Sequence, residues 1–202
     1  IIVAELTVTS GPISQVGCAI TCSFVAACIS SRELRRNGPP DKIRVVIHPQ
    51  SIVHGFVEFV DGSAIAQLSK PDMALAVQYA LTAPERLPGV VEPLDLTALG
   101  RLEFIEPDME LFPVLSYAYE ALEGGWWEPV ALNAINETLV GAFLRGEISF
   151  GTLLKLVCDC FEKRSKAAGG SGFSTDEPER LDDILKAHSV FRDFALSALD
   201  GH

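Results

Sequence analysis

The sequence has 202 residues, of which 48% are hydrophobic and 21% are charged, so it is long enough and apolar enough to bury the core of one or two domains. Acidic residues outnumber basic residues by 27 to 16, which gives a formal net charge of −11. Phosphate backbones and anionic membrane surfaces repel such a chain, so the composition argues against nucleic-acid and membrane partners.

The first 40 residues show little regular periodicity and end in the turn signal Asn37-Gly38-Pro39-Pro40. The chain opens without the basic region of a secretory signal, and its most apolar run, residues 16–29, is shorter than the roughly 20 residues that span a bilayer. The five cysteines contain no pair of C-x2-C units, which indicates free or buried thiols rather than a zinc site. We therefore expect a soluble, cytoplasmic protein.

Short runs with strand character follow this opening. Residues 43–47 are β-branched, and residues 53–60 alternate between two faces. Asp61-Gly62 is a dipeptide that favours hairpins, so residues 63–68 are expected to return as an antiparallel strand. The strand at residues 43–47 is expected to be a neighbour of this hairpin.

A helix is predicted over residues 71–82. Pro71 suits the first helical turn, and Asp72 places a negative charge near the positive end of the helix dipole. The proline-rich residues 84–107 predict an irregular connecting segment.

The C-terminal part of the chain, residues 108–202, predicts a helical domain. Apolar residues recur at helical spacing in four stretches, at residues 115–122, 129–144, 150–162 and 179–199. A flexible loop is expected at residues 166–177, and Trp126-Trp127 are expected to anchor neighbouring helices. Four amphipathic helices bury their apolar stripes against one another, so we predict a four-helix-bundle-like domain.

Two histidines stand six residues apart after the first predicted strand. His48 and His54 enclose the string H-P-Q-S-I-V-H, and imidazole is the usual general acid or base at neutral pH. No Asp or His partners stand around them at metal-ligand spacing, and Ser51 lies too near His54 in sequence for the usual nucleophile–base pair. On these residues alone, structural histidines are the simpler interpretation.

Several strings, taken together in their order and spacing, resemble the 1-deoxy-D-xylulose 5-phosphate reductoisomerase family over about residues 39–200. They include I-H-P-Q-S-I-V-H, V-D-G-S, P-D-M and Q-Y-A-L-T, followed by A-Y-E-A-L, L-N-A-x-N-E and I-S-F. They lie at residues 47–54, 60–63, 71–73, 78–82, 118–122, 132–137 and 148–150.

The resemblance implies an NADPH-dependent homodimeric enzyme that uses Mn²⁺ or Mg²⁺. Such an enzyme converts the sugar phosphate 1-deoxy-D-xylulose 5-phosphate to 2-C-methyl-D-erythritol 4-phosphate in non-mevalonate isoprenoid biosynthesis, in the cytoplasm or, in an organism with plastids, in the plastid. It also implies an α+β chain in which the end of a central catalytic and dimerisation domain precedes a C-terminal helical bundle. The expected parts are an unmatched segment (1–40), a domain remnant (41–83), a connecting segment (84–107) and the bundle (108–202).

The family's functional residues map onto four positions of this sequence. The resemblance implies that His54 borders the active site, that Pro71 and Met73 lie on the nicotinamide side, and that His48 has a supporting role. Three neighbouring positions depart from the family pattern and put the shape of the nicotinamide end in doubt. They are Gly55, Ala74 and Ala76.

The family's metal-binding D-S-E string, its G-S-G-G segment, its tryptophan-bearing flap and its M-N-K-G-L-E string have no match here, and the sequence has no G-x-G-x-x-G loop. We therefore expect no metal ligands in this chain and no activity of the chain alone. Because the sequence starts at Ile1, we expect a fragment, a processed product or an incomplete translation. The abrupt loss of the family's strings before Pro39 suggests an out-of-frame translation or a wrong upstream exon as the origin of residues 1–40. The alternatives are a non-enzymatic dimerisation or interaction module and a small enzyme that uses His48 and His54.

Overall fold

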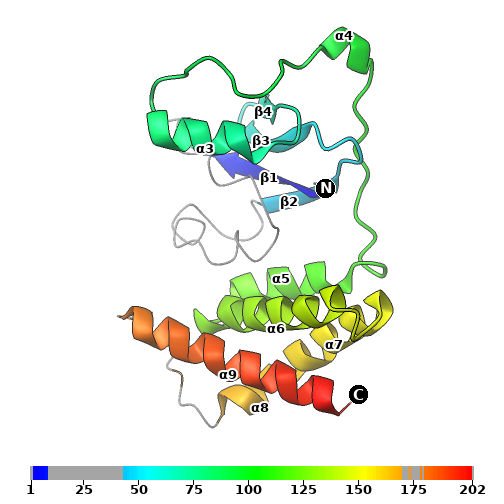
Figure 1. Ribbon diagram of the computed structural model, residues 1–202, viewed down its shortest axis with the longest axis vertical. Helices are drawn as coiled ribbons and strands as arrows, with labels where there is room; N and C mark the ends of the chain where they lie inside the picture. Colours follow the sequence, from blue (N-terminus) through cyan, green and yellow to red (C-terminus); the bar gives the residue numbers. More distant parts are fainter. Residues whose placement is uncertain (1, 9–42, 170–172, 174–177, 179, 202) are drawn as a thin grey trace. The chain divides into compact units, whose positions relative to one another are not determined.

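The computed structural model in Figure 1 describes residues 2–8, 43–169, 173, 178 and 180–201. These residues belong to two compact units, which meet in the sequence between Pro107 and Asp108. The strands lie in the first unit and the long helices of the bundle in the second, so the predicted α+β class is confirmed. Within the described part of the chain, no helix is long and apolar enough to cross a membrane.

Unit 1 is built on a four-stranded mixed sheet with the strand order β2-β1-β3-β4 (Figure 1). Its strands are β1 (Ile2–Val8), β2 (Ile43–Ile47), β3 (Val53–Phe59) and β4 (Ala64–Leu68). β3 and β4 are antiparallel and joined by the predicted tight turn, where Gly62 has a φ of 81° that favours glycine. Burial alternates along β3, with Val53 and Val57 on the covered face, as the sequence pattern predicts.

One predicted strand pairing was wrong. The strand at residues 43–47 was expected to lie beside the hairpin, but β1 lies between β2 and β3. β1 is antiparallel to β2 and parallel to β3. A parallel pairing between segments so distant in sequence has no local turn signal, so periodicity and turn residues do not indicate it.

The helix after β4 begins two residues later than predicted. α3 spans Met73–Thr82, and Asp72 is its N-cap, with a side-chain oxygen that accepts a hydrogen bond from the Ala74 N–H at 2.8 Å. Pro71 therefore precedes the helix instead of forming its first turn. α3 has no buried residues, and a short helix, α4 (Leu96–Leu99), interrupts the segment that was predicted to be irregular.

Unit 2 is the predicted helical bundle. Its helices are α5 (Pro113–Glu123), α6 (Trp127–Leu144), α7 (Phe150–Glu162), α8 (Arg164–Ala168) and α9 (Leu181–Asp200). The bounds of α7 match the prediction, and those of the other three long helices match within two residues. The short helix α8 occupies the start of the loop predicted at residues 166–177, most of which lies outside the described residues.

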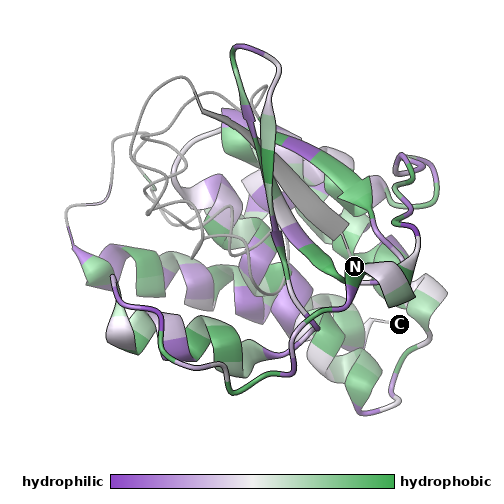
Figure 2. Cartoon of the chain, turned by 90° about the horizontal axis from the view of Figure 1, so that it is seen from above, coloured by the Kyte–Doolittle hydropathy of each residue, from purple (hydrophilic) through white to green (hydrophobic). Residues whose placement is uncertain are grey.

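The core of unit 2 lies between α5, α6, α7 and α9, and Phe161 and Phe191 are fully buried in it. In Figure 2, hydrophilic (purple) and hydrophobic (green) residues alternate along the helices, as expected for amphipathic helices. Trp127 on α6 stacks on Phe191 of α9 with ring centroids 5.8 Å apart, which confirms the predicted anchor. Cys160 of α7 is 2% exposed and belongs to this core, so it is one of the buried thiols that the sequence allowed.

Candidate functional site

The four residues singled out from the sequence gather at one edge of the sheet in unit 1. β2 ends at Ile47, which pairs with Ile2 at the start of β1, and β3 starts at Val53, which pairs with Leu68 at the end of β4. β1 and β3 run parallel in matching register, so these strand termini lie at the same end of the sheet. We call this end, where β1 and β3 start and β2 and β4 finish, the sheet edge. His48, His54 and the turn that leads into α3 all follow directly from this edge.

His48 lies behind the edge and is completely buried. Its Nδ1 is 2.7 Å from the backbone oxygen of Glu103, and a carbonyl only accepts, so Nδ1 carries the proton. The ring stacks on Phe104, with centroids 4.9 Å apart and an interplanar angle of 19°. Nε2 is buried without a hydrogen-bond partner within the described residues. This environment favours a supporting role rather than direct contact with a substrate.

The loop after His48 ties the connecting segment to the sheet edge. The Gln50 side chain donates to the Arg101 oxygen at 3.3 Å and accepts from the Glu103 N–H at 3.1 Å. Ile47 and Ile105 exchange two backbone hydrogen bonds of 2.8 and 2.9 Å. The connecting segment thus meets the end of β2 through an isolated bridge between Ile47 and Ile105. We call this set of residues the clasp: His48, Gln50 and residues 101–105.

His54 lies on β3 at an irregularity in the pairing with β4. Val53 pairs with Leu68 and Gly55 with Gln67, so His54 is the extra residue of a β-bulge. Bulges re-aim side chains and occur often beside active sites. The His54 side chain is half-buried, on the face of β3 opposite to the covered one.

Pro71 and Met73 lie in the turn that follows β4 at the same edge. The chain is fixed just before them, because the Ser69 N–H donates to the Ile52 oxygen at 3.0 Å. Pro71 is exposed, and Met73, the first residue of α3, is 47% exposed. The edge therefore presents one half-buried imidazole and a small apolar surface, with His48 behind them.

The described residues do not fit the metal that the family uses. Within the described ranges, no group of three or more His, Cys, Asp or Glu side chains is placed to hold a metal ion. The turn with Pro71 and Met73 is exposed, and the sequence has no G-x-G-x-x-G loop for a pyrophosphate.

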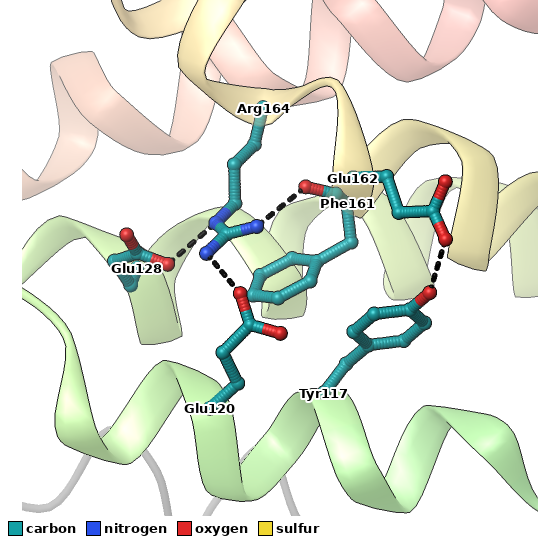
Figure 3. Close-up of polar contacts among 6 residues, drawn as sticks. All are labelled: Tyr117, Glu120, Glu128, Phe161, Glu162 and Arg164. Carbon is teal, nitrogen blue, oxygen red and sulfur yellow. Dashed lines mark hydrogen bonds and ion pairs between the residues drawn. The ribbon is translucent and has the colours of Figure 1, made fainter.

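A second polar cluster lies in unit 2 (Figure 3) and was missed in the sequence. Arg164 binds Glu128 at 2.5 Å and Glu120 at 2.6 Å, and its third nitrogen donates to the Phe161 oxygen at 2.9 Å. Its guanidinium also lies 3.9 Å from the centroid of the Phe161 ring. These contacts join α5 and α6 to the junction of α7 and α8, so the cluster is a structural crosslink. Its members are distant in sequence and follow no periodic pattern, so no local signal indicates them.

A neighbouring hydrogen bond joins α5 and α7. Tyr117 donates to Glu162 at 2.5 Å (Figure 3). This bond, together with burial and the negative charge of Glu162, raises the pKa of Tyr117 to about 12. The phenol therefore stays neutral at physiological pH and holds the two helices together.

Comparisons with known proteins agree with this architecture. A family model described as the DXP reductoisomerase C-terminal domain matches residues 68–194. The 1-deoxy-D-xylulose 5-phosphate reductoisomerase of Endomicrobium trichonymphae is 54% identical over 117 residues, which are 58% of this chain and 30% of that protein. The enzyme of the same name from Pelodictyon phaeoclathratiforme is 45% identical over 157 residues, which are 78% of this chain and 39% of that protein.

Solved structures give the same result. The structure of 1-deoxy-D-xylulose 5-phosphate reductoisomerase from Zymomonas mobilis in complex with NADPH is 28% identical, with a TM-score of 0.69, and the match covers 98% of this chain and 55% of that chain. A structure of DOX-P reductoisomerase in complex with NADPH, fosmidomycin and magnesium is 31% identical, with a TM-score of 0.74, and the match covers 98% of this chain and 55% of that chain.

The mixed sheet with its clasped edge, followed by a helical bundle that matches the family's C-terminal domain, defines an α+β protein of the reductoisomerase class. The chain belongs to the 1-deoxy-D-xylulose 5-phosphate reductoisomerase family. The resemblance noted in the sequence is thereby confirmed. The chain spans 30% and 39% of the two curated relatives and about half of each of the two solved chains.

Proposed function

We propose that this chain supplies the C-terminal part of an NADPH-dependent enzyme that converts 1-deoxy-D-xylulose 5-phosphate to 2-C-methyl-D-erythritol 4-phosphate. The observation that carries the proposal is the gathering of His54, Pro71 and Met73 at one open sheet edge, in a chain of this family. We expect the chain by itself to be inactive, because its described residues supply this border of the active site and no group placed to hold a metal.

Each residue of the edge has a role in this proposal. His54 borders the substrate, and it lies at a bulge, a feature that re-aims side chains and is frequent beside active sites. Pro71 and Met73 contact the nicotinamide of NADPH, which supplies the hydride when it is bound. Their exposed apolar surface excludes water from one side of that ring. His48 supports the edge from behind.

A chimera tests the proposal. Residues 43–202 replace the matched part of the Pelodictyon phaeoclathratiforme relative, and NADPH oxidation is followed at 340 nm with 1-deoxy-D-xylulose 5-phosphate and Mn²⁺ or Mg²⁺. We expect turnover by the chimera and none by the chain alone. A chimera that has the circular dichroism of the relative but no turnover would overturn the proposal.

The alternative is a non-enzymatic module for dimerisation or interaction. The observation in its favour is the apolar surface of α3, where Val77 is 52% exposed and Leu81 is 82% exposed. A homodimer would cover such a surface in either case, so light scattering tests only the dimer, and the activity of the folded chimera separates the two functions. A dimeric chain together with an inactive but folded chimera would favour the module. The cytoplasmic or plastid location stays a prediction.

A further inference from the structure

We propose that His48 is a positioning residue for His54, which it reaches through the aromatic rings of Phe104 and Phe56. This inference rests on the proposed function, in which His54 borders the substrate. The connecting segment, residues 84–107, would then hold side chains at the sheet edge in place, which a simple linker does not do.

The first step is the contact between His48 and the connecting segment. The buried imidazole holds the segment in two ways, through the Nδ1 hydrogen bond to the Glu103 oxygen and through the stack on Phe104. Gln50 and the Ile47–Ile105 bridge fix the same stretch independently. The ring of Phe104 is therefore held at the sheet edge by several contacts.

The second step leads from the connecting segment to β3. Phe104 meets Phe56 edge-on, with centroids 5.2 Å apart and an interplanar angle of 66°. Phe56 follows His54 by two residues on β3, and both side chains are half-buried, whereas Val53 and Val57 are buried. The inference is that the Phe56 ring limits the space open to the His54 imidazole.

The third observation is that the arrangement keeps unfavourable features. The buried Nε2 of His48 has no hydrogen-bond partner within the described part of the chain. Ser51, in the turn after His48, has a φ of 58°, a value that non-glycine residues seldom adopt. Features of this kind persist mainly where the surrounding structure has a functional use for them.

Three substitutions in the whole chain separate the two contacts of His48. His48→Ala removes both, His48→Asn keeps a donor near the Nδ1 position, and His48→Phe keeps a ring that can stack on Phe104. The first readout is the nuclear magnetic resonance signal of the His54 imidazole, assigned by its loss in His54→Gln. The signal of His188, which lies in unit 2, is the internal control.

The second readout is the rate of trypsin cleavage after Arg101. The Arg101 side chain is 82% exposed, but the clasp binds the backbone on either side of the bond that is cut. We expect His48→Ala to accelerate cleavage at least threefold and His48→Asn to restore most of the protection through Glu103. Cleavage after Arg86, which is held by α3 instead through the ring of Tyr79, serves as the reference in the same digest.

The positioning role predicts that His48→Ala shifts or broadens the His54 signal and that His48→Phe returns it toward its original place. If His48→Ala accelerates cleavage but leaves the His54 signal unchanged, His48 is an anchor only and the proposal is overturned. Should His48→Ala fail to fold, Phe104→Leu interrupts the same path with His48 intact, and an unchanged His54 signal would again overturn it. The His54 signal and the cleavage rate are both measured without turnover. An inactive chimera would therefore contradict the proposed function but would leave the test of His48 unaffected.

Discussion

The crosslink around Arg164 gives a quantitative prediction for the stability of unit 2. In Arg164→Met the apolar stem remains, but the guanidinium and its contacts with Glu128, Glu120 and Phe161 are lost. The side chains of Arg164 and Glu128 are only 12% and 14% exposed, so the substitution leaves a nearly buried carboxylate without its partner.

The size of the effect follows from this burial. Removing one partner of a buried ion pair costs about 3–5 kcal/mol, and the remaining exposure of Glu128 places this pair near the lower end. The pair with Glu120, which is 52% exposed, adds at most about 1 kcal/mol. We expect Arg164→Met to lower the free energy of unfolding by about 3 kcal/mol. With an m-value of about 1.5 kcal/mol/M, the urea midpoint falls by about 2 M.

Tryptophan fluorescence during urea unfolding measures this change directly. The chain has two tryptophans, Trp126 and Trp127, and both lie in unit 2, so the signal reports the bundle. Arg145→Met is the matched control, because its pair with Glu147 is more than half exposed and is worth about 0–1 kcal/mol. Equal urea midpoints for Arg164→Met and Arg145→Met would refute the claim that burial makes the Arg164 ion pairs contribute more to the free energy of unfolding.

Two further predictions concern a tyrosine and the apolar turn. Because the folded pKa of Tyr117, about 12, lies above its ordinary value of 10.0, its contribution to stability is complete below pH 10 and is lost as the pH rises from 10 to 12. Tyr117→Phe should remove a step near pH 12 from an absorbance titration at 295 nm and flatten this pH dependence; an unchanged titration would contradict the assignment. In the chimera, Met73→Ala should raise the KM for NADPH several-fold, whereas Leu81→Ala, at an 82% exposed position of the same helix, should leave it unchanged. Equal effects would contradict a specific nicotinamide contact.

The bundle could be predicted closely from the sequence, because its helices depend on local patterns. Apolar residues at helical spacing located α5, α6, α7 and α9, and the Asp61-Gly62 turn located the hairpin. The place of β1 could not be predicted in this way. Its parallel pairing with β3 joins segments about 50 residues apart, and only the assembled sheet brings them together.

The sequence named the members of the candidate site, but not the environment in which each one lies. The residues themselves indicate His48 and His54 equally, since both are imidazoles in one short string, and only the family resemblance assigns His54 to the border of the active site and His48 to a supporting role. Only the structure shows that His48 is buried against Glu103 and Phe104 while His54 stands half-buried on a bulge. The clasp itself joins residues more than 50 positions apart, so no spacing rule would have indicated it.

The central claim is that this sheet edge borders the active site, and one comparison in the chimera tests it most directly. His54→Gln and His188→Gln each remove one half-buried imidazole. His188 is the control, because it lies on α9 in unit 2, with its Nε2 3.5 Å from Glu137. We predict that His54→Gln lowers kcat/KM for 1-deoxy-D-xylulose 5-phosphate by about 10- to 100-fold, while His188→Gln stays within twofold of the parent. A His54→Gln chimera with unchanged kcat/KM would contradict the account.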